Sequence, residues 1–246
     1  VVYQDLLNQG VDAVPHFQPT TLIGHVGSLG NHTDNIFPMG GISHRTTVAS
    51  NENGKYMIYK SDRFGFNNPD HVWDSTNVEW LLTGDSMTQG IAVQPGQDIG
   101  GQIRSHTKQR VINLGMSGNG PLMELAALKE YAESQKPQTV LWLYFEGNDL
   151  VGDLIKEKTS GILMHYLDPE YSQNLIGRQN EIDAIISAHI KNELTSRNRL
   201  SFGDILKLSN IREILIHNQN YITIDPLFFK IIKEAQVRVS AWGGRM

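Results

Sequence analysis

The segment VEWLLTGDS (residues 78–86) joins an apolar run to an abrupt Gly-Asp-Ser ending. A near-continuous apolar run of this length is typical of a strand buried on both faces of a parallel sheet. Turns also use these residues for local reasons, because Gly takes positive φ and Asp and Ser side chains bond nearby backbone groups. Ser86 therefore has two interpretations at this point: a nucleophile presented at the end of a strand, or an ordinary turn residue.

Two more segments repeat this pattern further along the chain. RVINL (110–114) ends in Gly115, and TVLWLYF (139–145) is followed by Gly147. Segments with helical patterns, 97–108 and 121–134, separate the three runs. This alternation predicts β-α-β units, a parallel sheet and an α/β fold. Polar residues at the three strand ends would then gather at the carboxyl edge of the sheet, where such folds place their chemistry.

The chain after Asn148 is predicted to be helical, over 182–194, 201–217 and 225–239. The last of these helices has Asp225 as N-cap and Pro at its first position. No further strand is predicted, so TVLWLYF would lie at an uncovered edge of the sheet. A long apolar edge strand promotes aggregation, and we therefore expect either another chain to cover it or the sequence to stop before the next strand.

The first third of the chain has a different character. Residues 1–74 are predicted to form an irregular N-terminal extension with one short strand at 56–59, and residues 75–246 the main domain. An Asn-Gly turn before the strand and a Gly- and Asn-rich loop after it support this division.

Composition narrows the classes of function. The 246 residues include 39% hydrophobic and 19% charged residues, and the net charge is −5. This balance disfavours nucleic acid as a partner, because phosphate binding needs a basic face. The absence of cysteine excludes disulfides, zinc-thiolate sites and a cysteine nucleophile. No apolar run is long enough to span a membrane.

Ser86 can act as a nucleophile only with a base and with donors for the developing oxyanion. The Ser86 amide, the Gly118 amide after the second strand and the Asn148 side chain after the third are candidate donors. Each of these residues taken singly is an ordinary turn residue. As a set on three consecutive strand ends, they favour the catalytic interpretation.

Three short motifs resemble the first three blocks of the SGNH (GDSL-like) hydrolase superfamily. They are GDS at 84–86, N-x-x-x-x-G at 113–118 and GND at 147–149. The resemblance implies a flavodoxin-like three-layer α/β/α fold with a parallel sheet and acyl-ester chemistry without a cofactor or metal. It also implies that Ser86 is the nucleophile, Gly118 the backbone oxyanion donor and Asn148 the side-chain oxyanion donor.

The lead-in YKSDRFGFNNPD (59–70) resembles a segment that precedes the GDS block in bacterial members of this superfamily, several of them linked to cell-surface glycans. The resemblance implies a small-molecule or glycan acyl ester as substrate, acetyl esters of carbohydrates above all, and an extracytoplasmic or cell-envelope setting. An O-acetyltransferase of the same fold and a glycan-binding protein without catalysis are the alternatives.

The family's last block, D-x-x-H, is missing. None of the nine histidines has Asp three residues before it. The ending EAQVRVSAWGGRM (234–246) is similar to the helix and turn that precede the family's fourth strand. We therefore expect the sequence to be truncated, its remaining strands and catalytic His and Asp to be missing, and the chain as given to be nearly inactive.

The same parts of the sequence allow two other interpretations. The glycines of 115–120 suggest a nucleotide or S-adenosylmethionine loop, but their spacing is not G-x-G-x-x-G. Asp85, Asp149 and Asp153 could gather around a metal, yet they lack a histidine at ligand spacing, and Asp85 is predicted to brace the Ser86 loop.

Two further features of the sequence could concern carbohydrate. Residues 31–33 fit the N-glycosylation pattern, which is common by chance. Trp142, Tyr144 and Phe145 could form a sugar platform, but their place on an apolar strand predicts that they belong to the core.

Overall fold

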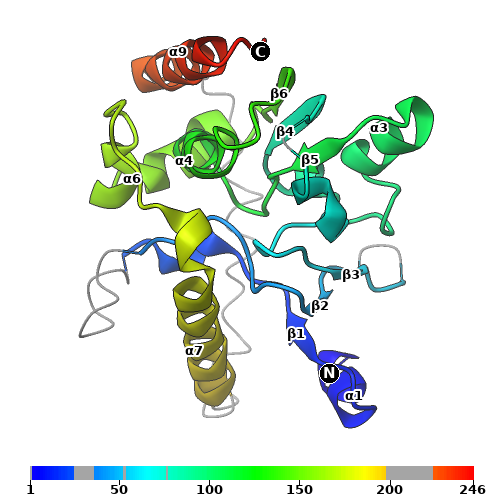
Figure 1. Ribbon diagram of the computed structural model, residues 1–246. Coiled ribbons are helices and arrows are strands. Elements are labelled where there is room, and N and C mark those ends of the chain that lie inside the picture. The colour runs from blue at the N-terminus through cyan, green and yellow to red at the C-terminus, as the bar shows by residue number, and fades with distance from the viewer. Residues whose placement is uncertain (1, 25–35, 52–53, 76, 198–223) are drawn as a thin grey trace.

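The computed structural model describes residues 2–24, 36–51, 54–75, 77–197 and 224–246. Two three-stranded sheets and a set of helices make up the described part (Figure 1). The strands are β1 (Ala13–Pro15), β2 (Thr46–Val48), β3 (Ile58–Lys60), β4 (Trp80–Gly84), β5 (Val111–Asn113) and β6 (Thr139–Leu143). The α-helices are α1 (Val2–Asn8), α2 (Ser86–Gln89), α3 (Ile99–Thr107), α4 (Pro121–Tyr131), α5 (Leu154–Glu157), α6 (Gly161–His165), α7 (Gln179–Arg197) and α9 (Pro226–Ala241). Short helical turns are η1 (Pro19–Leu22), η2 (Asp70–Trp73), η3 (Asp149–Asp153, a π turn) and η4 (Leu175–Arg178).

The larger sheet has the order β5-β4-β6, and all its strands are parallel. Leu81 of β4 is aligned with Ile112 of β5 and with Val140 of β6, and all three side chains are buried. In Figure 1, α3 and α4 flank this sheet. The predicted parallel α/β sheet is confirmed, and β4, which carries the GDS motif at its end, is its central strand.

Aspartate side chains cap two of the helices, and the cap at Asp225 was predicted from the sequence. Asp98 caps α3 by accepting a hydrogen bond from the Gly101 amide at 2.8 Å. Asp225 caps α9 in the same way, and Pro226 is the first residue of that helix. The prediction of a helix over 182–194 is confirmed by α7, whereas the one over 201–217 lies outside the described residues.

Helix α4 is buried along its whole length. Its charged residues are tolerated because each has partners: Lys129 donates to the carbonyls of Tyr166 and Asp168, and the Glu130 carboxylate accepts hydrogen bonds from Tyr166, Ser172, Gln173 and Leu175. Buried charges persist only with such pairing. These contacts tie the segment that follows α6 to the core of the larger sheet.

The outer edge of β6 is partly covered. Arg245 pairs with the first residues of β6 in parallel: its carbonyl accepts from the Val140 amide at 2.8 Å and its amide donates to Gln138 at 3.0 Å. The sequence predicted that this strand would lie at an uncovered edge. β6 is indeed an edge strand of the described sheet, but the residues after α9 cover its beginning.

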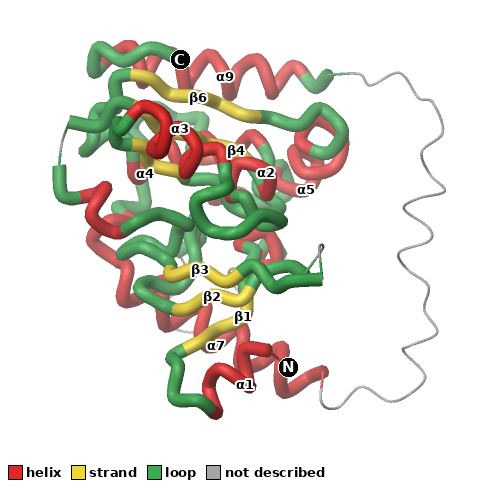
Figure 2. The backbone as a smooth tube through the Cα atoms, turned by 90° about the vertical axis from the view of Figure 1, so that its right-hand side faces the viewer, coloured by secondary structure: helices red, strands yellow, loops and turns green. Residues whose placement is uncertain are grey.

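The N-terminal part contains more regular structure than predicted. β2 pairs in parallel with β1 and antiparallel with β3, so a second sheet forms where one strand was predicted. Figure 2 shows this sheet apart from the larger one, with α7 and α1 beside it. Strands of three residues are too short to show an alternating pattern, which is why the sequence did not reveal them.

The two parts of the chain share one hydrophobic core. Buried side chains of the N-terminal part, among them Phe37 and Phe66, belong to the same cluster as Leu81, Ile112 and Leu125. The predicted division at residue 74 stays a prediction. No described helix has the length and apolar character that crossing a membrane requires.

The loop between β3 and η2 is organised around the buried carboxylate of Asp62. This carboxylate accepts hydrogen bonds from the amides of Phe64 and Phe66, from the Asn68 side chain at 2.9 Å and from the Trp73 indole at 2.7 Å. Four donors hold the ionised group, although burial raises the pKa of Asp62 to about 6. The loop is therefore rigid, and it fixes Asn68 against the sheet.

Asn68 covers the outer edge of β5. Its Oδ1 accepts from the Asn113 amide at 2.9 Å, and its Nδ2 donates to the Asn113 carbonyl at 2.9 Å. One carboxamide thus takes the place of a neighbouring strand, since it offers the same donor and acceptor as a peptide group. This explains what the YKSDRFGFNNPD segment does in the fold.

Replacing Asn68 tests this edge contact. Asn68→Ala leaves both backbone groups of Asn113 buried without partners, and we expect a loss of about 2–4 kcal/mol in the free energy of unfolding. Asn67→Ala is the matched control, because Asn67 makes one hydrogen bond, to the Gln89 carbonyl at 2.9 Å, and should cost about 1 kcal/mol. Urea unfolding measures both; equal losses would contradict the role given to Asn68.

Candidate active site

Ser86 is the first residue of α2 and directly follows the carboxyl end of the central strand β4. Asp85 braces this junction as predicted, because its Oδ1 accepts from the Met87 amide at 2.8 Å. The Ser86 side chain is half-buried, and Met87 beside it is 65% exposed. Within the described part of the chain, the Ser86 hydroxyl has no hydrogen-bond partner. The hydroxyl thus lies at the end of the strand and makes no hydrogen bond to another described residue.

Asn113 holds the neighbouring loop against α2. Its Nδ2 donates to the Thr88 carbonyl at 2.6 Å, and its Oδ1 accepts from the Gly115 amide at 2.8 Å. Gly115 approaches α2 so closely that a Cβ there would lie 2.5 Å from the Gln89 nitrogen. Only glycine permits this approach. The loop after β5 is therefore fixed relative to Ser86.

Gly118 has the conformation expected of a glycine that presents its amide. Its φ is +78°, in the left-handed region. The amides on either side are both committed: Ser117 donates to the Gln89 side chain at 2.9 Å and Asn119 to the Met116 carbonyl at 3.1 Å. The Gly118 amide donates to no other described residue, and neither does the Ser86 amide.

Unpaired backbone amides are rare inside proteins. Ser86 and Gly118 are both half-buried, so a ligand can reach them. Two uncommitted N–H groups on neighbouring loops are what an oxyanion requires. Sequence reasoning selected these two residues, and the structure adds that their amides are unpaired in the described part of the chain.

Asn148 lies after β6, on the other side of β4, and begins the turn η3. Its Nδ2 donates to Asp153 at 2.9 Å, and its Oδ1 is buried without a partner. One of the two amide hydrogens is thus committed to Asp153, and the other remains. The three predicted site residues therefore lie at the carboxyl ends of three adjacent strands.

Carboxyl groups of the β4 and β6 loops gather behind this edge. Burial raises the pKa of Asp149 to about 7, and repulsion by Asp85 and Asp153 adds to the rise. Burial likewise raises the pKa of Asp153 to about 6, against the hydrogen bond from Asn148. Within the described ranges, no three His, Asp or Glu side chains are arranged to hold a metal ion.

Glu157 occupies the amino end of α4. Its carboxylate accepts hydrogen bonds from the amides of Gly120 at 2.7 Å, Leu122 at 2.9 Å and Met123 at 3.3 Å. Burial raises its pKa to about 8 although these donors oppose the rise. A nucleotide phosphate would use the same amides, so this contact argues against the nucleotide-loop alternative. Nothing in the sequence pattern around Glu157 pointed to this role.

The fully buried Glu124 of α4 is a further acid with a raised pKa. It accepts a hydrogen bond from the Trp142 indole, and burial together with the negative charge of Asp149 and Glu157 raises its pKa well above the ordinary range. These surroundings thus disfavour the ionised form of the Glu124 carboxyl group.

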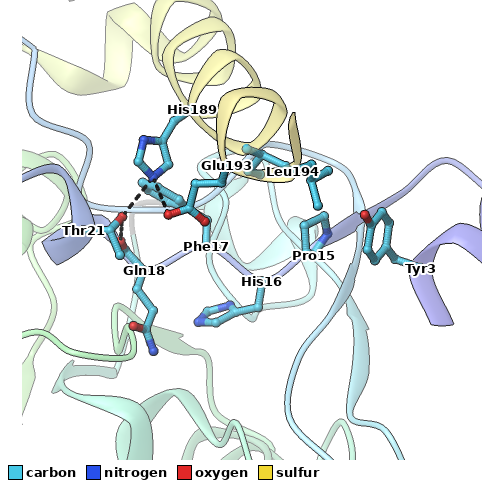
Figure 3. Close-up of a pocket in the computed structure, with 10 residues that line it drawn as sticks. Tyr3, Pro15, His16, Phe17, Gln18, Thr21, His189, Glu193 and Leu194 are labelled. Carbon is cyan, nitrogen blue, oxygen red and sulfur yellow. Dashed lines mark hydrogen bonds and ion pairs between the residues drawn. The ribbon is translucent and has the colours of Figure 1, made fainter. Parts of the chain in front are cut away.

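No described histidine is hydrogen-bonded to Ser86. His16 and His189 line a separate cavity of about 330 Å³ between α7 and the N-terminal segment (Figure 3). There His189 contacts Thr21 at 3.3 Å and pairs with Glu193 at 3.6 Å. His25, His32 and His217 lie outside the described residues. The base for Ser86 is not identified among the described contacts.

Two aromatic residues differ from the prediction. Tyr144 and Phe145 are 51% and 50% exposed, so the prediction that they belong to the core is wrong. The reason is that β6 ends at Leu143, and both residues lie beyond the covered sheet at its carboxyl edge. Trp142 is partly buried against the core, as predicted.

No protein-family model matches this chain, and neither does any curated protein. Among solved structures, the chain is similar to the crystal structure of AlinE4, an SGNH-hydrolase family esterase, with 19% identity over 67% of this chain and 95% of that chain and a TM-score of 0.28. Two single-substitution variants of that esterase match with 19% identity, over 69% and 67% of this chain and 98% and 95% of theirs, at TM-scores of 0.28 and 0.27. At these TM-scores the similarity decides neither the fold nor the chemistry of this chain.

The raised pKa of Glu157 predicts a pH dependence of stability. The group titrates near 4.5 when unfolded and near 8 when folded, so its contribution is fully present below pH 4.5 and is lost as the pH rises toward 8. The free energy of unfolding should fall by up to about 1.4 kcal/mol per pH unit for this proton.

Glu157→Gln removes the titration and keeps an acceptor for the α4 amides. Its free energy of unfolding, from urea titrations at pH 5, 6.5 and 8, should fall less steeply than that of the parent protein. Glu170→Gln at an exposed position is the matched control. Parallel pH profiles for the parent and Glu157→Gln would show that Glu157 does not carry this dependence.

Proposed function

We propose that the chain carries a serine ester hydrolase site of SGNH type, with Ser86 as nucleophile. The observation that carries the proposal is the pair of unpaired amides, Ser86 and Gly118, beside a Ser86 hydroxyl at the end of the central strand. A turn serine would need no second unpaired amide on the neighbouring loop. A flavodoxin-like three-layer arrangement of the sheet is part of the same proposal.

The chemistry follows from these groups. The Ser86 oxygen attacks the ester carbonyl carbon while a base takes the hydroxyl proton, and the carbonyl oxygen becomes an oxyanion. The amides of Ser86 and Gly118 and the free amide hydrogen of Asn148 donate to that oxygen. Collapse expels the alcohol, which takes up the proton, and leaves an acyl group on Ser86. Water, or a sugar hydroxyl in the transferase alternative, then accepts the acyl group.

Acetyl esters of carbohydrates are the proposed substrates. Tyr144 and Phe145 support this choice, because two half-exposed rings lie in the same loop as Asn148. Tyr144 packs against Phe228 with 5.4 Å between ring centroids, so this ring is held in place. A fixed aromatic face suits the C–H face of a sugar ring.

Ser86→Ala tests the nucleophile. In the protein that contains this chain, hydrolysis of p-nitrophenyl acetate should fall at least about 10³-fold, because the acyl acceptor is removed. Asn148→Ala should lower kcat by about 10²-fold through the loss of one oxyanion donor. The exposed Ser134→Ala variant is the control and should keep full activity. Unchanged turnover in Ser86→Ala would rule out this site.

The aromatic residues test the substrate class. Tyr144→Ala and Phe145→Ala should each raise KM about fivefold for an acetylated oligosaccharide, which corresponds to about 1 kcal/mol of lost ring contact. KM for p-nitrophenyl acetate should change little, because this substrate has no sugar. An equal change for both substrates would argue against a glycan contact at these rings.

A further inference from the structure

Gln89 is the last residue of α2, and its side chain is completely buried. Its Oε1 accepts from the Ser117 amide at 2.9 Å, and its Nε2 donates to the Tyr59 hydroxyl at 3.2 Å. Its backbone carbonyl accepts from the Asn67 side chain at 2.9 Å. One residue of α2 thus contacts both the loop that carries Gly118 and the N-terminal part of the chain.

The orientation of this carboxamide is determined by its partners. The Ser117 amide can only donate, so Oε1 must face it, and Nε2 must then face Tyr59. Tyr59 lies on β3, is 4% exposed, and keeps its proton because burial raises its pKa above the ordinary range. The phenol oxygen therefore accepts one hydrogen bond from Gln89 and locks the carboxamide in place.

The contact with Ser117 fixes the peptide group that precedes the Gly118 amide. The Ser117 N–H is held by Gln89, whereas Gly118 has a left-handed φ of +78° and an N–H that donates to no other described residue. Because Gln89 and Ser86 belong to the same short helix, the nucleophile and the Gly118 amide are held in one frame.

We propose that Gln89 is a positioning residue that aims the Gly118 amide at the oxyanion, and that Tyr59 of the N-terminal sheet holds Gln89 in that role. This inference rests on the proposed esterase function and deepens it. It makes the N-terminal part, predicted as an irregular extension, a working part of the active site.

Gln89→Met tests the proposal, since it keeps the size of the side chain and removes both hydrogen bonds. The substitution should lower kcat for p-nitrophenyl acetate about 10- to 100-fold and leave KM within about twofold, because the Gly118 amide stabilises the transition state and not the bound substrate. Tyr59→Phe should lower kcat by less. The double variant should be no worse than Gln89→Met alone, because both act through one contact.

Two further measurements separate positioning from stability. Gln102→Met is the matched control, since Gln102 is exposed and also makes a side-chain hydrogen bond, to Gly96 at 2.9 Å; its kcat should be unchanged. In amide hydrogen exchange, the Ser117 N–H should exchange faster in Gln89→Met than in the parent protein. The measurement is made at a pH and temperature at which the thermal unfolding curve shows that the variant is fully folded. Tyr59→Phe carries the test if Gln89→Met does not fold.

The outcomes distinguish the two claims. The inference is supported if the turnover of the parent protein depends on Ser86 and if Gln89→Met and Tyr59→Phe lower kcat without changing KM. An active parent with an equally active Gln89→Met variant, or a change in KM alone, overturns the positioning role only. A parent without Ser86-dependent turnover overturns the esterase site itself and this inference with it.

Discussion

The carboxamide of Asn113 is the contact on which the candidate site depends. It joins the carbonyl of Thr88 in the helix after Ser86 to the Gly115 amide in the loop that leads to Gly118. The backbone N–H and C=O of Asn113 are hydrogen-bonded to the Asn68 side chain, which covers the outer edge of β5. Together with the hydrogen bond from Ser117 to Gln89, the Asn113 carboxamide holds the two loops that carry the unpaired amides in a fixed arrangement.

The site shows how a rigid loop can keep reactive groups uncommitted. Around Ser86 and Gly118 the neighbouring amides are paired, Met87 with Asp85 and Ser117 with Gln89. Their pairing fixes the backbone, whereas the Ser86 and Gly118 amides donate to no other described residue. Unpaired amides of this kind carry a cost in folding, because the described contacts do not satisfy them.

The larger sheet was predictable because each of its strands is an apolar run that ends in glycine, and the positions of Ser86, Gly118 and Asn148 followed from that order. The roles of Gln89 and Glu157 were not predictable, because Gln89 contacts Ser117, 28 positions away, and Glu157 contacts residues 34–37 positions away. The prediction for Tyr144 was wrong for a related reason. The apolar run continues beyond Leu143, where the strand ends, so its last residues are not covered by the rest of the protein.

A structure of the protein reacted with a p-nitrophenyl phosphonate ester tests the central claim most directly. The account predicts phosphorus bonded to the Ser86 oxygen, with a non-bridging oxygen accepting hydrogen bonds from the Ser86 and Gly118 amides at about 2.7–3.1 Å. An adduct on another residue, or an adduct on Ser86 whose oxygens point away from both amides, would contradict it.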